Sequence, residues 1–465
     1  MGTEILWYQE SDFQLMKNAQ FKRKRLTSFQ IIIIGFFSVI LTGSVLLMLP
    51  VSSNAGRATP FSEALFTATS AACVTGLVVH DTATYWSSFG QAVILLLIQI
   101  GGMGVVTIAV ALSVISGRKI GLNQRSTMQE AIAAPSVGGI VRLTGFIIRS
   151  TIVIEATGAI LMLPVFLKER RVGKGIWYAV FHSISAFCNA GFDLMGEKRQ
   201  YSSLTSYADN YMINMVIIGL IVVGGIGFLT WDDVKCKGIH FGRYRMQSKV
   251  ILVTTYCLIF FPFLFFFFGE FQRPVWEPLS LEDKIMAALF QTVTPRTAGF
   301  NTVDLTQFSD TGLTIMMVLM LIGGSPGSTA GGMKTTTLAV LLITSLAVFR
   351  RKEDTECFGR RIDDGTIRYA ATIVMMYFTL FFAGGILISG IENLPMMTCL
   401  FETASAIGTV GLSLGITPEL GNISRMILIL LMFMGRVGGL TLVFAAFSGK
   451  EKTAIRLPKE KITVG

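Results

Sequence analysis

One short motif recurs four times in this chain at nearly constant spacing. Each copy is a short apolar run followed at once by a polar turn that ends in a glycine and an apolar residue. The four turns read CVTGL at 73–77, CNAGF at 188–192, RTAGF at 296–300 and GTVGL at 408–412. Their glycines are spaced by 115, 108 and 112 positions, at Gly76, Gly191, Gly299 and Gly411. So regular a period indicates one unit copied four times, and four units around an axis can enclose a pore.

The composition predicts an integral membrane protein. Of the 465 residues, 52% are hydrophobic and 15% are charged, and the mean hydropathy is +0.62. These values fit neither a soluble globule nor a disordered chain. Uncharged stretches of about 20 residues, the helical length that crosses roughly 30 Å of hydrocarbon, recur along the whole sequence. We expect eight spans, near residues 29–50, 89–116, 143–166, 210–231, 250–269, 311–349, 369–390 and 423–447.

A shorter apolar run lies between the two spans of each unit and leads directly into the glycine turn. These runs are too short to cross a bilayer, and they lie near residues 62–73, 176–188, 285–295 and 396–408. An irregular turn at membrane depth must be buried in protein or line a watery cavity. Four half-helix C-termini aimed at one axis would favour a cation, whose hydration the turn carbonyls could replace. Glycine permits the positive φ angles that such turns require.

The second span of each unit carries a glycine cluster of its own. The clusters read IGGMG at 100–104, VGGIG at 223–227, IGGSPG at 322–327 and MGRVGG at 434–439. Their recurrence supports the fourfold repeat. In the first two units, close packing of helices is an equally good reason for these glycines.

These residues resemble the Trk/Ktr/HKT superfamily of potassium transporters, whose filter signatures match VTGL, FCNAGF, TPRTAGF and GTVGL. The resemblance covers about residues 25–457, and QTVTPRTAGFN at 291–301 is its most specific string. It implies an all-α integral membrane fold of four pseudo-symmetric M1–pore-helix–M2 repeats around one central ion pathway. It also implies K⁺ bound by backbone carbonyls of the filter residues Val74, Thr75, Gly76, Asn189, Ala190, Gly191, Thr297, Ala298, Gly299, Thr409, Val410 and Gly411.

The repeats divide the chain into six parts. We expect a cytoplasmic N-terminal segment at 1–25, repeat 1 at 26–116, repeat 2 with its preceding cytoplasmic loop at 117–231, repeat 3 at 232–349, repeat 4 at 350–447 and a cytoplasmic tail at 448–465. Lysine and arginine concentrate in the termini and in the loops that share their side, which predicts cytoplasmic termini. A basic cluster at 168–174 runs against this trend.

The third repeat differs from the others because GGSPGSTAGG at 323–332 interrupts its second helix. Glycine, serine and proline at this density cannot remain helical. The segment resembles the intramembrane gating loop of the superfamily, so we expect it to obstruct the pore below the filter. It is not a phosphate-binding loop, because Met333 separates Gly332 from Lys334 and no strand precedes it. The gating residues implied are Gly323, Gly324, Ser325, Gly327, Gly331, Gly332, Lys334 and Arg436.

Arg436 is a cation inside the fourth unit's second span, where burial costs at least about 3 kcal/mol. Such a charge is expected to face the interior of the bundle. Its position after Gly435 matches an arginine of the superfamily that acts as an electrostatic barrier below the filter. Pairing with a backbone carbonyl or a carboxylate is the structural alternative.

The sequence also limits which partners and activities are expected. The net charge of +10 comes from short juxtamembrane loops, where attraction to membrane lipid explains it without nucleic acid. Six cysteines and three histidines show no metal-site or disulfide spacing, so neither an enzyme nor an organic cofactor is expected. The resemblance implies the membrane subunit of a bacterial Ktr or Trk uptake system in the cell membrane, a homodimer on a ring of nucleotide-binding RCK subunits. An alternating-access transporter, Na⁺-linked uptake and Na⁺ transport stay open.

Overall fold

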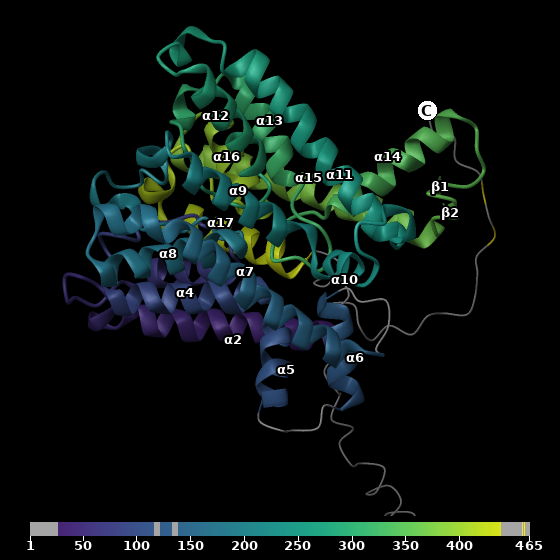
Figure 1. The fold of residues 1–465 in the computed structure, drawn as a ribbon, viewed down its shortest axis with the longest axis horizontal. Helices are drawn as coiled ribbons and strands as arrows, with labels where there is room; N and C mark the ends of the chain where they lie inside the picture. Colours follow the sequence, from purple (N-terminus) through teal and green to yellow (C-terminus); the bar gives the residue numbers. More distant parts are fainter. Residues whose placement is uncertain (1–26, 116–120, 133–137, 439–457, 459, 461–465) are drawn as a thin grey trace, which may run out of the picture.

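The computed structural model describes residues 27–115, 121–132 and 138–438, with residues 458 and 460. The expected N-terminal segment 1–25, the end of repeat 4 and nearly all of the tail 448–465 therefore lie outside the described residues. The described part is mostly helical (Figure 1). Its only strands, β1 (Glu356–Cys357) and β2 (Arg360–Arg361), form one antiparallel hairpin.

The helices follow the same order four times. A long helix comes first in each unit: α2 (Ser28–Met48), α7 (Ile140–Glu169), α11 (Met246–Phe265) and α15 (Asp364–Glu392). A short helix follows: α3 (Phe61–Ala72), α8 (Val172–Phe187), α12 (Leu281–Val293) and α16 (Met396–Gly408). The glycine turn and a second helical segment complete the unit, as α4 (Ser88–Met103) with α5 (Val105–Ile115), α9 (Tyr211–Ile226) with α10 (Phe228–Lys237), α13 (Asp310–Leu321) with α14 (Thr335–Phe349), and α17 (Asn422–Val437).

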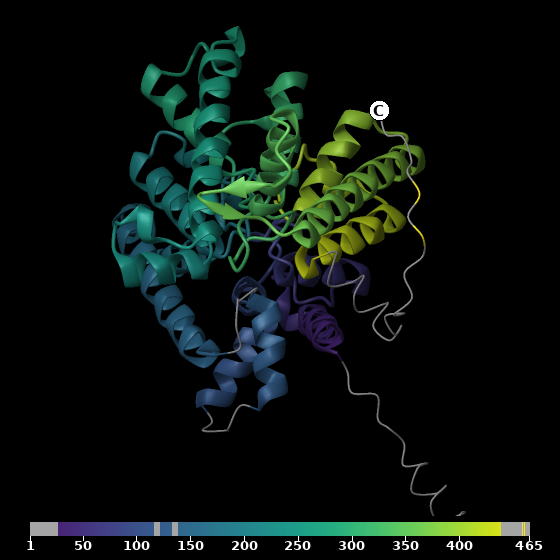
Figure 2. The same cartoon turned by 90° about the vertical axis from the view of Figure 1, so that its right-hand side faces the viewer.

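Smaller elements join these units. Helix α6 (Leu122–Ile132) pairs with α5, and in both views the two extend away from the other helices (Figures 1 and 2). A π-helical turn (Phe266–Glu270) extends α11. Short 3₁₀ turns lie at Pro50–Ser52, Met195–Glu197, Thr205–Tyr207, Phe241–Arg243, Pro274–Trp276, Leu305–Gln307 and Thr417–Glu419.

Local sequence explains where several helices begin. The Thr27 side chain accepts a hydrogen bond from the Gln30 backbone amide, and the Gln30 side chain accepts one from the Thr27 backbone amide. This reciprocal pair is a capping box at the start of α2. The side chains of Ser87 and Asn210 cap α4 and α9 in the same role. Each cap satisfies amide groups that a helix leaves unpaired at its first turn.

Packing between units closes a cycle. Each long helix packs against the short helix of its own unit, as in α2 with α3 and α7 with α8. Each second helix packs against the short helix of the next unit: α4 with α8, α9 with α12, α13 with α16, and α17 with α3. The last contact joins the fourth unit to the first. The four short helices therefore surround one centre.

The second helices depart from the sequence expectation. The interruption predicted in the third unit is present, between α13 and α14. Two other spans expected to be continuous are also broken, at Gly104 (φ 85°) and at Gly227 (φ 100°), and α17 ends just before Gly438 (φ 87°). The break at Gly227 bends the chain by 94°. Glycine tolerates these φ values, which other residues rarely adopt.

Among the residues that the structure describes, four helices are long and apolar enough to cross a membrane: α2, α7, α15, and α11 with its π-turn. The bent pair α9 and α10 adds a fifth if it counts as one span. Breaks divide the second helices of the first and third units into pieces shorter than the roughly 20 residues that a span needs. The count of eight spans stays a prediction.

Candidate functional site

The four motif glycines meet in one ring. A Cβ atom added to Gly76 would lie within 3.0 Å of the Ala190 carbonyl oxygen, the residue before the next glycine. The same relationship joins each glycine to the carbonyl before the next one, and it closes when Gly411 meets the Thr75 carbonyl. The φ angles are 91°, 68°, 78° and 93° at Gly76, Gly191, Gly299 and Gly411. Both the close approach and the backbone angles therefore require glycine.

A second left-handed residue stands two positions before each glycine. These residues have φ of 58°, 58°, 69° and 51° at Val74, Asn189, Thr297 and Thr409. Left-handed backbone is costly for β-branched side chains. Such strain persists only where the surroundings enforce it, and it concentrates at functional sites. The sequence motif gave no sign of this second constraint.

Hydroxyl side chains at the ends of the short helices hold the turns in place. Ser70 Oγ accepts a hydrogen bond from the Gly76 amide at 3.1 Å, and Ser405 Oγ accepts one from the Gly411 amide at 3.0 Å. In the other two turns the hydroxyls of Ser185 and Thr294 donate to backbone carbonyls. Sequence reasoning missed these residues. The pattern that could have identified them is a serine six positions before the motif glycine, which occurs in three of the four repeats.

One cavity opens onto the ring. It has a volume of about 320 Å³, and its lining includes all four motif glycines. The carboxylates of Asp193 and Glu419 also line it. Turns from all four units therefore reach one cavity.

Three threonine hydroxyls of the turns have no partner within the described part of the chain. They are buried and belong to Thr75, Thr297 and Thr409. A buried hydroxyl without a hydrogen bond costs free energy unless water or an ion satisfies it. The twelve predicted filter residues thus lie in turns that converge, and three of these turns hold a buried hydroxyl oxygen without a described partner.

The loop at 323–332 lies directly against the turns. Thr329 Oγ1 donates to the Phe187 carbonyl at the end of α8 at 2.9 Å. A side chain at Gly331 would clash with Thr409, and the Gly332 amide donates to the Gly435 carbonyl at 3.2 Å. The loop therefore packs against the second and fourth turns. Its gating role stays a prediction.

The other predicted loop residues hold its shape. The Gly323 amide donates to the Met333 carbonyl at 2.8 Å, and the Gly324 carbonyl accepts from Thr335 at 3.0 Å. The Ser325 amide donates to the Gly225 carbonyl at 2.9 Å, and the Gly327 carbonyl accepts from the Phe228 amide at 2.8 Å. The last two bonds tie the loop to the break between α9 and α10.

Two cations face this loop. Lys334 Nζ donates to the carbonyls of Ala330 at 2.9 Å and Gly331 at 3.3 Å. Arg436 donates to the Thr329 carbonyl at 2.5 Å and to the carbonyls of Gly101 and Gly102 at the end of α4. Both also line a second cavity, of about 370 Å³, with Gly332 and Gly104. The carbonyl pairing considered for Arg436 is present, and the side chain also faces a cavity next to the loop.

The glycine clusters of the second helices allow close packing. Side chains added at Gly101, Gly224 or Gly435 would clash with backbone carbonyls at the ends of α3, α8 and α16, respectively. This supports the packing explanation for the first two units. Among the described residues, no group of three or more His, Cys, Asp or Glu could hold a metal ion.

Apolar helices long enough to cross a membrane, together with buried irregular turns, define a multi-pass helical membrane protein. Comparison with known proteins narrows this class. The family model described as "TrkH: Cation transport protein" matches residues 6–454, and the chain belongs to this family.

Relatives match the chain along nearly its whole length. It is 39% identical to the potassium/sodium uptake protein NtpJ of Enterococcus hirae, over 95% of this chain and 98% of that protein. It is 39% identical to the Ktr system potassium uptake protein B of Bacillus subtilis, over 97% of this chain and all of that protein. The crystal structure of the potassium transporter TrkH from Vibrio parahaemolyticus has a similar fold. That match has a TM-score of 0.71 at 19% identity and covers 91% of this chain and 86% of that one.

Proposed function

We propose that this chain takes up K⁺ across a bacterial cell membrane through the ring of glycine turns. The single observation that carries the proposal is the cavity lined by Gly76, Gly191, Gly299 and Gly411. Turn carbonyls replace the hydration shell of the ion, and short helices that end at the turns favour a cation over an anion. Two full-length relatives carry potassium uptake in their names.

The repeat architecture belongs to the same proposal. Eight spans and four half-helices form the repeats 26–116, 117–231, 232–349 and 350–447 around the pathway, with both termini in the cytoplasm. The repeated order of elements and the cyclic packing of second helices on short helices support this arrangement. Spans that end near the lysine-rich and arginine-rich loops support the orientation.

The loop at 323–332 is the proposed gate. It narrows the pathway below the ring, and Arg436 and Lys334 hold it there through its carbonyls. The positive charge of Arg436 adds an electrostatic barrier to a passing cation. Opening then requires these hydrogen bonds to break or to shift.

Regulation is proposed to come from other polypeptides. The loops on the cytoplasmic side are too short to form a regulatory domain, so a homodimer of this chain would sit on a ring of nucleotide-binding RCK subunits. Na⁺ is a second candidate ion, because one relative is named a potassium/sodium uptake protein. An alternating-access cycle is the competing mechanism, and the broken second helices would suit it. Four units of one element order favour a fixed pore instead, since such transporters usually have two inverted repeats.

Growth of a bacterium that lacks potassium uptake tests the pathway. The chain should restore growth at low K⁺, and Gly299→Ser or Gly411→Ser should abolish this rescue, because a side chain there collides with the next turn. Gly56→Ser is the matched control, since Gly56 also has a positive φ (64°) but no atom lies within 4 Å of its Cβ position. Immunoblots of membranes verify equal abundance. Equal rescue by all variants would remove the ring from the pathway.

A further inference from the structure

A groove lies between the first part of α7 and α10, and none of the four motif glycines lines it. Its volume is about 750 Å³. Helix α7 contributes Arg142, Phe146, Arg149 and the residues beyond, while α10 contributes Trp231 and Lys235. No role assigned above uses this groove.

Two arginines in the groove have no counter-charge. Arg142 and Arg149 lie seven positions apart on α7, which is two helical turns and therefore one face. Both side chains are exposed, and neither forms an ion pair or hydrogen bond with a described residue. Across the groove, Lys235 Nζ lies 4.6 Å from the Phe146 ring centroid. Three cations thus line one concave surface.

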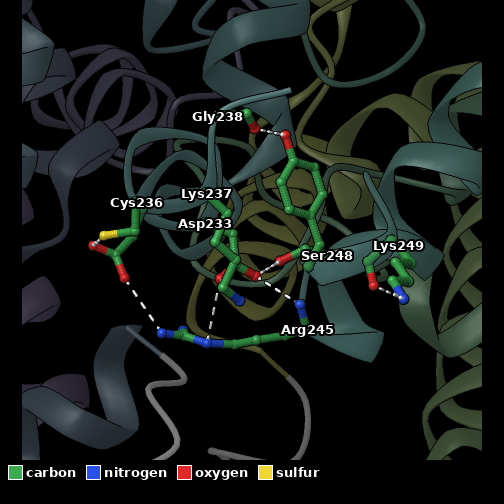
Figure 3. Close-up of polar contacts among 10 residues, drawn as sticks. Asp233, Cys236, Lys237, Gly238, Arg245, Ser248 and Lys249 are labelled. Carbon is green, nitrogen blue, oxygen red and sulfur yellow. Dashed lines mark hydrogen bonds and ion pairs between the residues drawn. The ribbon is translucent and has the colours of Figure 1, made fainter. Parts of the chain in front are cut away.

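The acidic residues nearby are already engaged. Asp232 pairs with Arg245 at 3.3 Å. Asp233 pairs with Arg245 at 3.5 Å (Figure 3) and with Lys237 at 2.8 Å. Asp233 also accepts a hydrogen bond from Ser248 at 2.7 Å. These carboxylates are balanced by their own partners, so Arg142, Arg149 and Lys235 keep a net positive charge.

The depth of the groove along α7 places it at a membrane boundary. About 20 residues of α7 follow Arg149, which is the length that crosses roughly 30 Å of hydrocarbon. Arg149 therefore lies where the hydrocarbon ends, and Arg142 lies about 10 Å further out, at 1.5 Å per residue. Lys235 lies at the same level, because its Nζ is 4.6 Å from the ring of Phe146, which stands between the two arginines on α7.

The other end of the groove is apolar. It is lined by Val153, Ile154, Val234 and the ring of Trp231. Gly145 leaves open space, with no atom within 4 Å of its Cβ position. The groove is therefore basic at the headgroup level and hydrophobic towards the membrane interior. A phospholipid has the same division between its phosphate and its acyl chains.

We propose that this groove binds one anionic phospholipid, with its phosphate between Arg142, Arg149 and Lys235 and an acyl chain along Val153 and Ile154. Arginine is well suited to phosphate because its planar fork donates two hydrogen bonds. Basic pockets between membrane helices recognise anionic headgroups by the same chemistry. A zwitterionic lipid gains less here, because its positive headgroup meets the same three cations.

Tryptophan fluorescence in lipid vesicles tests the site on the full-length chain. Trp231 lines the groove, so brominated phosphatidylglycerol should quench its emission more than brominated phosphatidylcholine at equal mole fraction. Arg142→Gln/Arg149→Gln should weaken this selective quenching by roughly 30-fold in lipid concentration, because each basic residue near an anionic surface contributes about fivefold. Lys235→Gln should weaken it by roughly fivefold on the same basis.

Two controls isolate the groove. Trp231→Phe should remove the selective signal while quenching of the other tryptophans persists. Arg350→Gln/Arg351→Gln should leave it intact, since this pair removes two exposed arginines at the end of α14. Equal quenching by the two lipids, or unchanged selectivity in the Arg142/Arg149 variant, overturns the proposal. None of these outcomes bears on potassium rescue.

Discussion

Arg436 donates a hydrogen bond to the carbonyl oxygen of Thr329 at 2.5 Å, and this contact joins the fourth unit to the loop of the third. The same guanidinium reaches the end of α4 in the first unit through the Gly101 and Gly102 carbonyls. Through Thr329, the loop in turn contacts the end of α8 in the second unit. The side chains of Arg436 and Thr329 together thus connect the loop to the other three units, next to the proposed pathway.

Neutralising Arg436 should increase ion flow. In Arg436→Gln the loop loses a charged anchor, and a cation entering the lower cavity no longer meets a fixed positive charge. At an effective dielectric constant of about 20, one charge roughly 8 Å away adds about 2 kcal/mol to the barrier, so flux should rise by roughly tenfold or more. Rubidium uptake into vesicles, without any regulatory subunit, measures this change.

Arg436→Lys is the matched variant for charge. It keeps the positive charge but cannot reach the Thr329 and Gly101 carbonyls with the same fork geometry. If the charge is the barrier, Arg436→Lys should stay close to wild type. If the hydrogen bonds to the loop matter more, both variants should conduct faster. Loss of folded protein in both, with no rise in flux, would assign Arg436 a structural role alone.

Shortening the loop should open the pathway without a regulatory subunit. Deleting Gly327 and Ser328 removes the carbonyl that accepts from the Phe228 amide, and it shortens the segment that packs below the ring. Rubidium uptake should then rise in the isolated membrane protein. Deletion of Phe358 and Gly359, a two-residue turn in the β1–β2 hairpin with φ of 49° and 73°, serves as the control. Unchanged uptake in the first deletion would argue against a gate.

The serines behind the ring should control selectivity. Ser405→Ala leaves the Gly411 amide without its 3.0 Å acceptor, and an unmade hydrogen bond of this kind costs about 1 kcal/mol. The Gly411 turn should loosen, and the preference for K⁺ over Na⁺ should fall by roughly fivefold. Ser44→Ala is the control, because this buried serine bonds only to the Ile40 carbonyl within α2. Competition of Na⁺ with rubidium uptake gives the ratio.

Much of the fold could be predicted because hydrophobic length and period dominate in a membrane. The short helix predicted at 62–73 is Phe61–Ala72, and the one predicted at 396–408 is Met396–Gly408. The breaks at Gly104 and Gly227 were not predicted. A lone glycine inside an apolar run reads equally as a tolerated helix residue, and only tertiary contacts decide its φ angle.

Part of the site could also be predicted, for a different reason. The motif glycines could be identified because a positive φ angle and a close backbone approach both require glycine, which is visible in the sequence. The left-handed angles at Thr297 and Thr409 left none, since threonine normally avoids that region and is held there by its surroundings. Arg436 could be located as a buried cation, but its acceptors on the third and first units depend on how the repeats close around the axis.

Asp233 should make the stability of the junction between the second and third units depend on pH. Burial disfavours its charge, but hydrogen bonds from Lys237 and Ser248 outweigh this, so the pKa of Asp233 lies below its ordinary value. A lowered pKa gives stability that is complete above the unfolded-state value of about 4 and is lost as pH falls through the folded-state value. Asp233→Asn should therefore destabilise the protein at neutral pH, by about 2 kcal/mol for the lost charged hydrogen bonds. Thermal unfolding in detergent should show this gap closing below pH about 4, whereas a gap that is constant with pH would mean that the carboxylate charge contributes nothing.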